Sequence, residues 1–176
     1  QVTKDECLNL PDKLYVNRHC PLTQEQDYYY SLAKERFFAD VMDYEREGRS
    51  WSSIPIFRLF SALQGIVCGF YTDGDQTLVL SNVRIRLLCR VIEDIPSHEP
   101  VVIWAKYHHA ITAIATRLER DHGQGAVAQF HGGLSETARN RELERWRSGA
   151  RFLIATQAAG GHGLDSGQHA ARLTAK

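Results

Sequence analysis

Apolar residues recur every three or four positions through the first half of the chain, a spacing typical of helices with one buried face. The first predicted helix begins at Thr23, because Thr23 followed by Gln26 fits a capping box, and it ends in the polar residues 45–49. A second helix is predicted from Ile54 or Pro55, since proline suits a first helical turn. The apolar positions are Tyr29, Ala33, Phe37, Val41 and Tyr44 in the first helix, and Ile56, Leu59, Phe60, Leu63, Val67 and Phe70 in the second. We expect these two faces to pack against each other.

Shorter patterns flank these helices. Leu14-Tyr15-Val16 is predicted to form a short strand. Residues 71–76 are predicted to form a turn, and Asp73-Gly74 within it indicates a hairpin, because aspartate-glycine pairs favour tight hairpin turns. Ser81 is expected to cap a following helix, which Pro96 ends.

The second half of the chain alternates between strands and helices. Apolar runs predict strands at 101–105, 126–130 and 152–155. Between them, apolar residues from Ile111 to Leu118 mark a helix that ends near Gly123, and residues 135–147 form a more polar helix. Strands that alternate with helices of this length predict an α/β fold, a parallel sheet with helices on its faces.

Composition narrows the class of protein. The 176 residues hold 21 basic and 21 acidic side chains, so the formal charge is zero. Neutrality argues against a purely electrostatic nucleic-acid binder, although it leaves room for a local basic strip. No apolar run approaches the ~20 residues that cross a bilayer, and no signal-peptide pattern is present, so we expect no membrane partner. The length suits one domain, or one domain plus a subdomain, and the start at Gln1 suggests an excised or processed piece.

The four cysteines, Cys7, Cys20, Cys68 and Cys89, form no Cys-x-x-Cys pair. Scattered thiols of this kind are typical of a reducing compartment. We therefore expect a cytoplasmic protein, or a nuclear one in a eukaryote. Without paired ligands we expect no zinc site.

Polar residues follow all three predicted strands at their carboxyl ends, where ligands bind in parallel sheets. Lys106-Tyr107-His108-His109 follows the first strand, His131-Gly132-Gly133 the second, and a run that begins Thr156-Gln157 the third. Each residue alone has an ordinary structural explanation, such as a solvated lysine or a helix start. Together they bring an ammonium group, imidazoles, a hydroxyl and glycine amides to one edge, a mixture suited to the sugar-phosphate backbone.

The run that follows the third strand, Ala155 to Asp165, is rich in glycine. Glycines after a strand let backbone amides approach a phosphate closely. The run lacks the Gly-Lys-Ser/Thr of a phosphate loop and the Gly-x-Gly-x-x-Gly of a dinucleotide site. On its own it indicates no more than a tight turn.

The order of these segments resembles the C-terminal motor lobe of superfamily-two helicases, in the Swi/Snf-like branch of DNA-dependent ATPases. The most specific matches are Phe130–Ser135, similar to the family's histidine- or aspartate-glycine block, and the glycine run, similar to motif V in its Ala-Ala-Gly-Gly variant. The other matching segments are Asp5–Leu32, which resembles the entry into the lobe, Ile56–Phe70 and Ser81–Ile95, which resemble its next helices, and Val101–Tyr107, which resembles motif IV. The shared order runs through most of the chain.

This resemblance implies a RecA-like lobe, a three-layer parallel sheet with helices on both faces, preceded by a helical subdomain. It divides the chain into an entry segment at 1–21, a helical insertion at 22–75 and the lobe itself at 76–176. It implies DNA as a partner, duplex or single-stranded and bound without regard to sequence, together with an N-terminal helicase lobe in the same parent chain. ATP and Mg²⁺ are the implied cofactors of that parent, bound mainly by the first lobe.

Carried over motif by motif, the resemblance assigns residues to the nucleic acid and to the ATP cleft. The nucleic-acid residues are Lys106, Tyr107, His108, His131, Gly132, Gly133, Thr156 and Gln157, and the ATP-cleft residues are Gly161, Gly163 and Asp165. No catalytic residue is assigned, because the family's Gly-Lys-Thr, Asp-Glu-x-His and motif VI arginines are absent from the sequence. We therefore expect no ATP hydrolysis by this chain alone, although the implied parent is an ATP hydrolase.

Two other classes of protein stay open at the level of the sequence. A regulatory or scaffolding domain that kept this fold and lost motor activity is favoured slightly by the missing motif VI. A sugar-nucleotide transferase lobe is also built from alternating strands and helices with a glycine-rich loop. A first motor lobe in the parent chain would exclude the former, and stabilisation by UDP-sugars rather than by duplex DNA would identify the latter.

Overall fold

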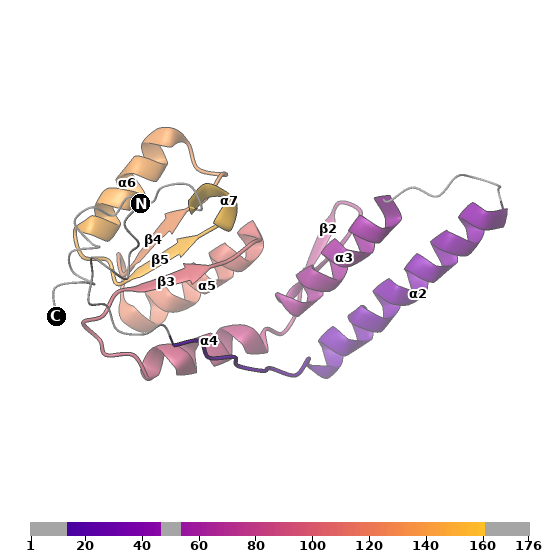
Figure 1. The fold of residues 1–176 in the computed structure, drawn as a ribbon, viewed down its shortest axis with the longest axis horizontal. Helices are drawn as coiled ribbons and strands as arrows, with labels where there is room; N and C mark the ends of the chain where they lie inside the picture. The colour runs from indigo at the N-terminus through magenta and orange to yellow at the C-terminus, as the bar shows by residue number, and fades with distance from the viewer. Residues whose placement is uncertain (1–13, 47–53, 161–176) are drawn as a thin grey trace, which may run out of the picture.

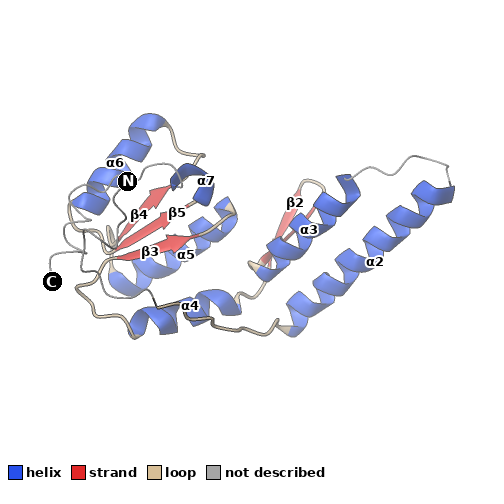
Figure 2. Cartoon of the chain, viewed as in Figure 1, coloured by secondary structure: helices blue, strands red, loops and turns tan. Residues whose placement is uncertain are grey.

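The structure is a computed structural model that describes residues 14–46 and 54–160 (Figure 1). It has two parts, a helical arm and a sheet body. The helical arm consists of α2 (Gln24–Arg46), α3 (Ile54–Val67), β1 (Phe70–Asp73) and β2 (Gln76–Val79). The sheet body consists of α4 (Val83–Glu93), β3 (Val101–Trp104), α5 (His108–His122), β4 (Val127–Phe130), α6 (Glu136–Arg147), β5 (Phe152–Ala155) and α7 (Gln157–Gly160). The arm projects away from the body, so the molecule is elongated (Figure 2).

The predicted capping box at the start of α2 is confirmed. The Thr23 N–H donates to Gln26 Oε1, and the Gln26 N–H donates to Thr23 Oγ1, both at 3.1 Å. The Gln26 side chain is fully buried, and its Nε2 donates to the Ile66 carbonyl at 2.8 Å. Gln26 thus caps the start of α2 and also links α2 to α3. The bond to Ile66 gives the buried Gln26 amide the hydrogen-bond partner that water no longer supplies.

Helices α2 and α3 pack side by side as an antiparallel pair, and the contact between their apolar faces was predicted from the sequence (Figure 1). Ala33 of α2 and Ile66 of α3 are buried together with Tyr71 and Leu80 from the hairpin region. The side chain of Tyr44, which was predicted for the same face of α2, lies outside the described residues. The arm therefore has a core of its own, separate from that of the sheet.

The apolar face predicted for α3 is partly wrong. Leu59 and Leu63 pack into the core of the arm. Ile56 and Phe60 are exposed, and Phe70 belongs to β1 rather than to the helix. Because α3 is apolar almost all round, spacing alone does not define its buried face. Neither α3 nor any other helix in the described ranges is long and apolar enough to cross a membrane.

The hairpin forms at the predicted turn. β1 and β2 pair antiparallel, with Asp73 opposite Gln76. Gly74 has a φ of +58° in the turn, a left-handed conformation that glycine adopts readily. The boundary predicted between residues 75 and 76 coincides with the start of β2, and Leu80 after that strand packs into the arm.

The short strand predicted at Leu14-Tyr15-Val16 is wrong. Residues 14–23 have no regular secondary structure, and Leu14 and Tyr15 are 87% and 85% exposed. A strand needs a partner for its backbone N–H and C=O groups. Within the described ranges, the paired strands are those of the hairpin and of the sheet body.

Helix α4 begins one residue later than predicted. Its cap is Asn82 rather than Ser81, and Asn82 Oδ1 accepts from two backbone N–H groups in the first turn, at 3.1 and 3.3 Å. The Ser81 N–H instead donates to Glu25 Oε2 of α2 at 2.8 Å. Asn82 Nδ2 also donates to the Cys68 carbonyl at 2.6 Å, so this one side chain joins the start of α4 to the end of α3.

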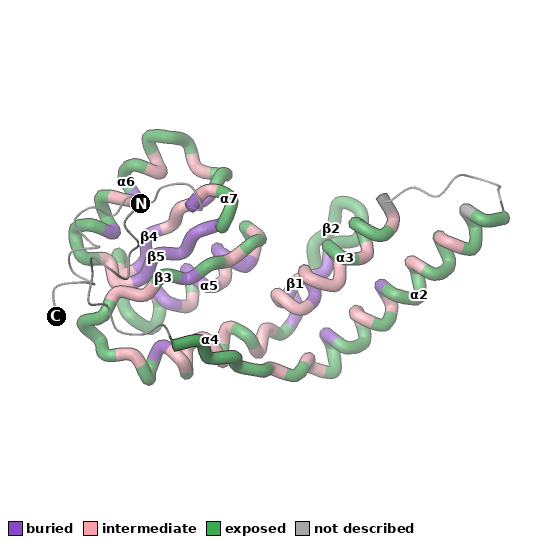
Figure 3. Tube along the Cα trace, viewed as in Figure 1, coloured by how far each residue is buried: buried purple, intermediate pink, exposed green. Residues whose placement is uncertain are grey.

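The sheet body confirms the predicted α/β arrangement. Its three strands are parallel and lie in the order β3-β5-β4. Helices α4 and α5 cover one face of the sheet and α6 covers the other, which gives the three layers of a RecA-like lobe (Figure 1). The middle strand β5 is buried along its whole length (Figure 3), as parallel strands covered on both faces are.

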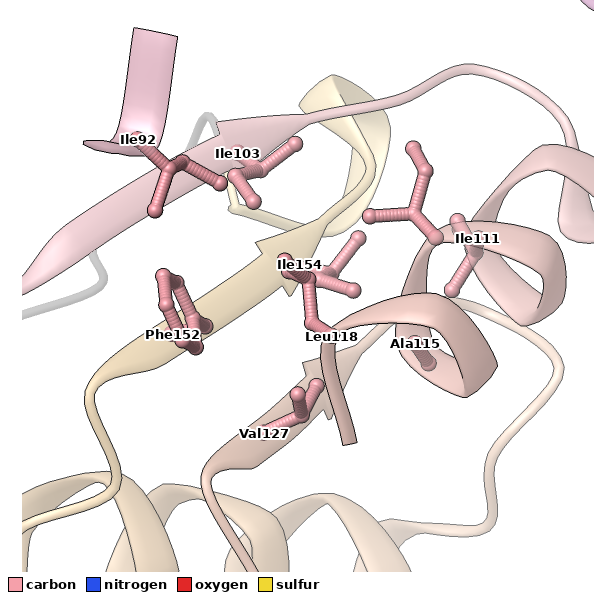
Figure 4. Close-up of a cluster of buried hydrophobic side chains, with 9 residues drawn as sticks. Ile92, Ile103, Ile111, Ala115, Leu118, Val127, Phe152 and Ile154 are labelled. Carbon is pink, nitrogen blue, oxygen red and sulfur yellow. The ribbon is translucent and has the colours of Figure 1, made fainter. Parts of the chain in front are cut away.

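The main core lies on the face of the sheet that α4 and α5 cover (Figure 4). Its buried members are Ile92, Ile103, Ile111, Ile114, Ala115, Leu118, Val127, Phe152 and Ile154. On the opposite face, Trp146 of α6 packs with Ala128 and Leu153. Both faces of the sheet are therefore held by apolar packing, which fixes the positions at which the strands end.

Candidate nucleic-acid interface

The carboxyl ends of the three strands lie level with one another. Trp104, Ala155 and Phe130 are aligned across the sheet. The Thr156 N–H donates to the Phe130 carbonyl at 3.1 Å, which continues the pairing beyond β5. The expectation that Lys106, His131 and Thr156 share one edge is confirmed, whereas their roles stay a prediction. This surface, residues 105–108, 131–133 and 156–157, is the carboxyl edge.

Two histidines that follow the outer strands β3 and β4 contact each other on the carboxyl edge. The rings of His108 and His131 meet edge to face, with their centroids 4.7 Å apart. The Gly133 N–H donates to His131 Nδ1 at 3.2 Å, so neutral His131 carries its proton on Nε2. A Cβ at position 133 would lie 2.7 Å from His108 Cε1, whereas one at position 132 would meet nothing within 4 Å. Glycine at 133 therefore lets the pair form, and Gly132 leaves open space beside it.

We expect the histidine pair to make the free energy of unfolding depend on pH. Burial, and after it the neighbouring His108, lowers the pKa of His131 from its ordinary value of 6.5. Because the folded state favours the neutral ring, the stabilisation is present above the unfolded pKa and is lost as the pH falls below it. We expect the free energy of unfolding to fall between about pH 7.5 and 5.5, and to fall less in His131→Asn.

Urea denaturation at both pH values measures this effect. Asparagine keeps an acceptor for the Gly133 N–H but does not titrate. His98→Asn, which removes an exposed imidazole, is the control and should retain the pH dependence of the parent chain. A His131→Asn variant whose stability falls with pH as steeply as that of the parent would contradict the prediction.

The third strand end continues into a short helix. Thr156 Oγ1 accepts from the Ala159 N–H at 3.3 Å, and the Thr156 carbonyl accepts from the Gly160 N–H at 2.9 Å. Thr156 is 9% exposed, so its hydroxyl is used inside the fold. Gln157, the next residue, is exposed. Of these two residues predicted to face nucleic acid, Gln157 is the one that presents its side chain to solvent.

The first strand end contacts the helical arm. Lys106 Nζ and the Tyr107 hydroxyl both donate to Gln64 Oε1 of α3, each at 2.7 Å. The Tyr107 ring also meets the Phe70 ring of β1 edge to face, with the centroids 5.3 Å apart. Lys106 stays exposed, so its charge faces solvent while the arm sets its position. The sequence analysis missed Gln64, because a single glutamine in an apolar helix gives no sign of its partner.

The residues predicted for the ATP cleft lie outside the described residues. Gly161, Gly163 and Asp165 belong to 161–176, so their role stays a prediction. Within residues 14–46 and 54–160, no group of three or more His, Cys, Asp or Glu side chains is placed to hold a metal ion. Among the residues predicted to bind nucleic acid, Lys106 supplies the permanent positive charge.

The three layers and the polar carboxyl edge define a RecA-like lobe joined to a helical arm. This arrangement is similar to the Sulfolobus solfataricus SWI2/SNF2 ATPase C-terminal domain, with a TM-score of 0.64 and 22% sequence identity over 88% of this chain and 68% of that one. It is also similar to the Sulfolobus solfataricus SWI2/SNF2 ATPase core in complex with dsDNA, with a TM-score of 0.62 and 21% identity. That match covers 88% of this chain and 33% of the ATPase core, so the chain spans about a third of its length.

No protein-family model matches the sequence, and no curated protein matches it. At 22% and 21% identity, the likeness to the solved structures establishes the fold. The chain has the fold of a SWI2/SNF2 ATPase C-terminal domain, as the order of its motifs predicted. The RecA-like fold class is likewise confirmed.

Proposed function

We propose that this chain is the second motor lobe of an ATP-dependent DNA translocase or helicase, and that its carboxyl edge contacts the nucleic-acid backbone. The observation that carries the proposal is the fold, since 88% of the chain matches a SWI2/SNF2 ATPase C-terminal domain. A relative with this fold is solved in complex with dsDNA. The carboxyl edge supports the proposal because three parallel strands deliver polar groups to one surface.

The groups on this edge suit contacts to sugar and phosphate. Lys106 supplies a positive charge, and Gln157 supplies an exposed amide. The open space at Gly132 lets a sugar-phosphate backbone approach the chain closely. His131 is buried, so in this proposal it holds the loop at Gly132 in place through its contacts with His108 and the Gly133 N–H. Contacts of this kind carry no base information, so we expect binding to duplex or single-stranded DNA that is indifferent to sequence.

ATP and Mg²⁺ belong, in this proposal, to the parent motor rather than to this chain alone. The sequence has neither Gly-Lys-Thr nor Asp-Glu-x-His, the residues that hold the phosphates and Mg²⁺ in such motors. We assign Gly161, Gly163 and Asp165 to one wall of the nucleotide cleft, and an N-terminal lobe of the same parent chain to the other. The chain alone is therefore expected to hydrolyse no ATP.

Fluorescence anisotropy with labelled duplex DNA tests the proposal. We expect weak binding that two unrelated sequences share, because the contacts are to the backbone. Between about 50 and 200 mM salt, the affinity should fall about 10- to 40-fold if about two or three phosphates are contacted. Absent binding, or binding that does not depend on salt, would contradict the proposed contacts.

A matched pair of lysine variants locates the contact. Lys106→Met removes the charge and keeps an aliphatic stem, so it should weaken binding and reduce the salt slope by about 1. Lys34→Met makes the same change on α2, where Lys34 Nζ lies 5.9 Å from the centroid of the Tyr30 ring, and should leave binding unchanged. Equal losses in the two variants would assign binding to overall charge rather than to the carboxyl edge.

A further inference from the structure

A cavity of about 620 Å³ lies where the helical arm meets the sheet body. Its walls come mainly from α3, α4, the end of β3 and the start of α5, with Tyr30 of α2 and Gln157 of α7. The apolar residues that α3 and α4 contribute to its walls include Phe60, Leu63, Val67, Ile85 and Leu88. This volume lies within the roughly 300–1,000 Å³ of small-molecule sites, which are mostly apolar with a few placed polar groups.

The charged side chains that line this cavity are both cations, Arg84 of α4 and Lys106 after β3. Within the described residues, no aspartate or glutamate lines it. Burial raises the pKa of the Cys68 thiol, and the charges of Arg84 and Lys106 both act to lower it. Arg84, Lys106 and the Cys68 thiol line the same cavity, and we call this part of it the cationic corner. Gln64 forms part of the same corner, because its Oε1 accepts from Lys106 Nζ at 2.7 Å.

The apolar walls suit an alkyl chain, and the cationic corner suits a negatively charged group at its end. Apolar surface buried against the walls contributes about 25 cal/mol per Å², whereas an anion taken out of water needs a charged partner. We propose that the cavity binds an amphipathic monoanion, a long-chain carboxylate whose apolar chain lies between α3 and α4 and whose carboxylate lies between Arg84 and Lys106. A nucleoside triphosphate fits less well, because apolar walls leave its base edges and most of its phosphate oxygens without partners.

A ligand in this place contacts both parts of the molecule. The hydrogen bonds that join the arm and the body include those from Lys106 and Tyr107 to Gln64, and the bond from Asn82 to the Cys68 carbonyl. Because the cavity exists only when both parts are in place, a ligand that fills it binds the folded chain and not the unfolded one. Binding should therefore raise the melting temperature, by an amount that grows with the logarithm of the ligand concentration relative to its Kd.

Calorimetric titration of the chain with dodecanoate, below its micelle concentration, tests the proposal. Dodecanol and dodecylammonium have the same alkyl chain with a neutral and a positive end. We expect dodecanoate to bind about tenfold or more tightly than either, because a hydrogen-bonded ion pair adds to the shared apolar contact. Equal binding of all three ligands overturns the role of the cationic corner. If none of them binds, the cavity is not a ligand site. ATP is titrated in the same way, and tighter binding of ATP than of dodecanoate overturns the proposed class of ligand.

Variants of the cavity make the test specific. Arg84→Glu should weaken dodecanoate binding about tenfold or more and leave dodecanol unaffected. Arg86→Glu makes the same charge reversal at an exposed position of α4 outside the lining, and should change neither affinity. Leu63→Trp should abolish binding of both ligands by filling the cavity, with circular dichroism as the check on folding. Unchanged dodecanoate affinity in Arg84→Glu, or an equal loss in Arg86→Glu, overturns the proposal. Because Lys106 and Gln157 belong to both sites, DNA binding of the same variants is measured separately, and its loss alone leaves this proposal standing.

Discussion

Truncation of Phe152 to alanine should lower the free energy of unfolding by about 3–5 kcal/mol. Phe152 is fully buried in the middle strand, within the core cluster of Figure 4, and its ring centroid lies 4.8 Å from that of His122. Removal of the ring leaves a cavity between the sheet and its helices, which a packed interior fills only in part. Urea denaturation followed by circular dichroism measures the change.

Phe57→Ala provides the matched control for that variant. The same ring is removed from α3, where Phe57 is 67% exposed, so we expect a change within about 0.5 kcal/mol. The comparison matters for the carboxyl edge, because β5 carries Thr156 and aligns the other two strand ends. If both variants lost the same stability, the sheet body would not be organised around β5.

Gly69→Ala should be similarly disruptive, with a loss of about 2–5 kcal/mol. Gly69 joins α3 to β1 with a φ of +91°, a conformation that alanine adopts only under strain. A Cβ there would also lie 2.6 Å from Asn82 Nδ2 and 2.8 Å from Asn82 Cβ. Asn82 caps α4 and bonds the Cys68 carbonyl, so its displacement would loosen the junction between the arm and the body. The same urea denaturation measures the loss.

Gly74→Ala separates the two causes. Gly74 also has a positive φ, +58°, but a Cβ at that position would meet nothing within 4 Å. Its substitution should therefore cost only the backbone strain, about 1–2 kcal/mol. The additional loss in Gly69→Ala then measures the contact with Asn82, and equal losses in the two variants would contradict the role assigned to that contact.

Most helices and strands could be predicted because their signals are local. The capping box of α2, the turn of the hairpin and the three apolar runs of the sheet each act through neighbours in sequence. Long-range contacts decided the rest. Asn82 rather than Ser81 caps α4, and the same Asn82 side chain bonds the Cys68 carbonyl, a long-range contact that the local pattern does not indicate. The buried face of α3 is set by its packing against α2 and includes Ile66, which fits the spacing of Leu59 and Leu63 but which the sequence analysis did not choose among the many apolar positions.

The carboxyl edge could be predicted as a set of residues, because parallel strands bring their carboxyl ends together. Its internal contacts could not be predicted. No pattern connects Gln64 with Lys106, 42 positions further along the chain, yet the two side chains are bonded in the folded structure. Nor does the sequence indicate that the Thr156 hydroxyl caps α7 while Gln157 stays exposed.

Nuclear magnetic resonance of the isotope-labelled chain, titrated with unlabelled duplex DNA, tests the central claim most directly. We predict saturable shifts of the backbone amides of Lys106, Gly132 and Gln157, reduced at high salt because the contacts are to phosphate. Amides on the exposed side of α6, such as that of Glu144, should stay unchanged. Shifts confined to α6 or to the helical arm, with none on the carboxyl edge, would contradict the proposed interface.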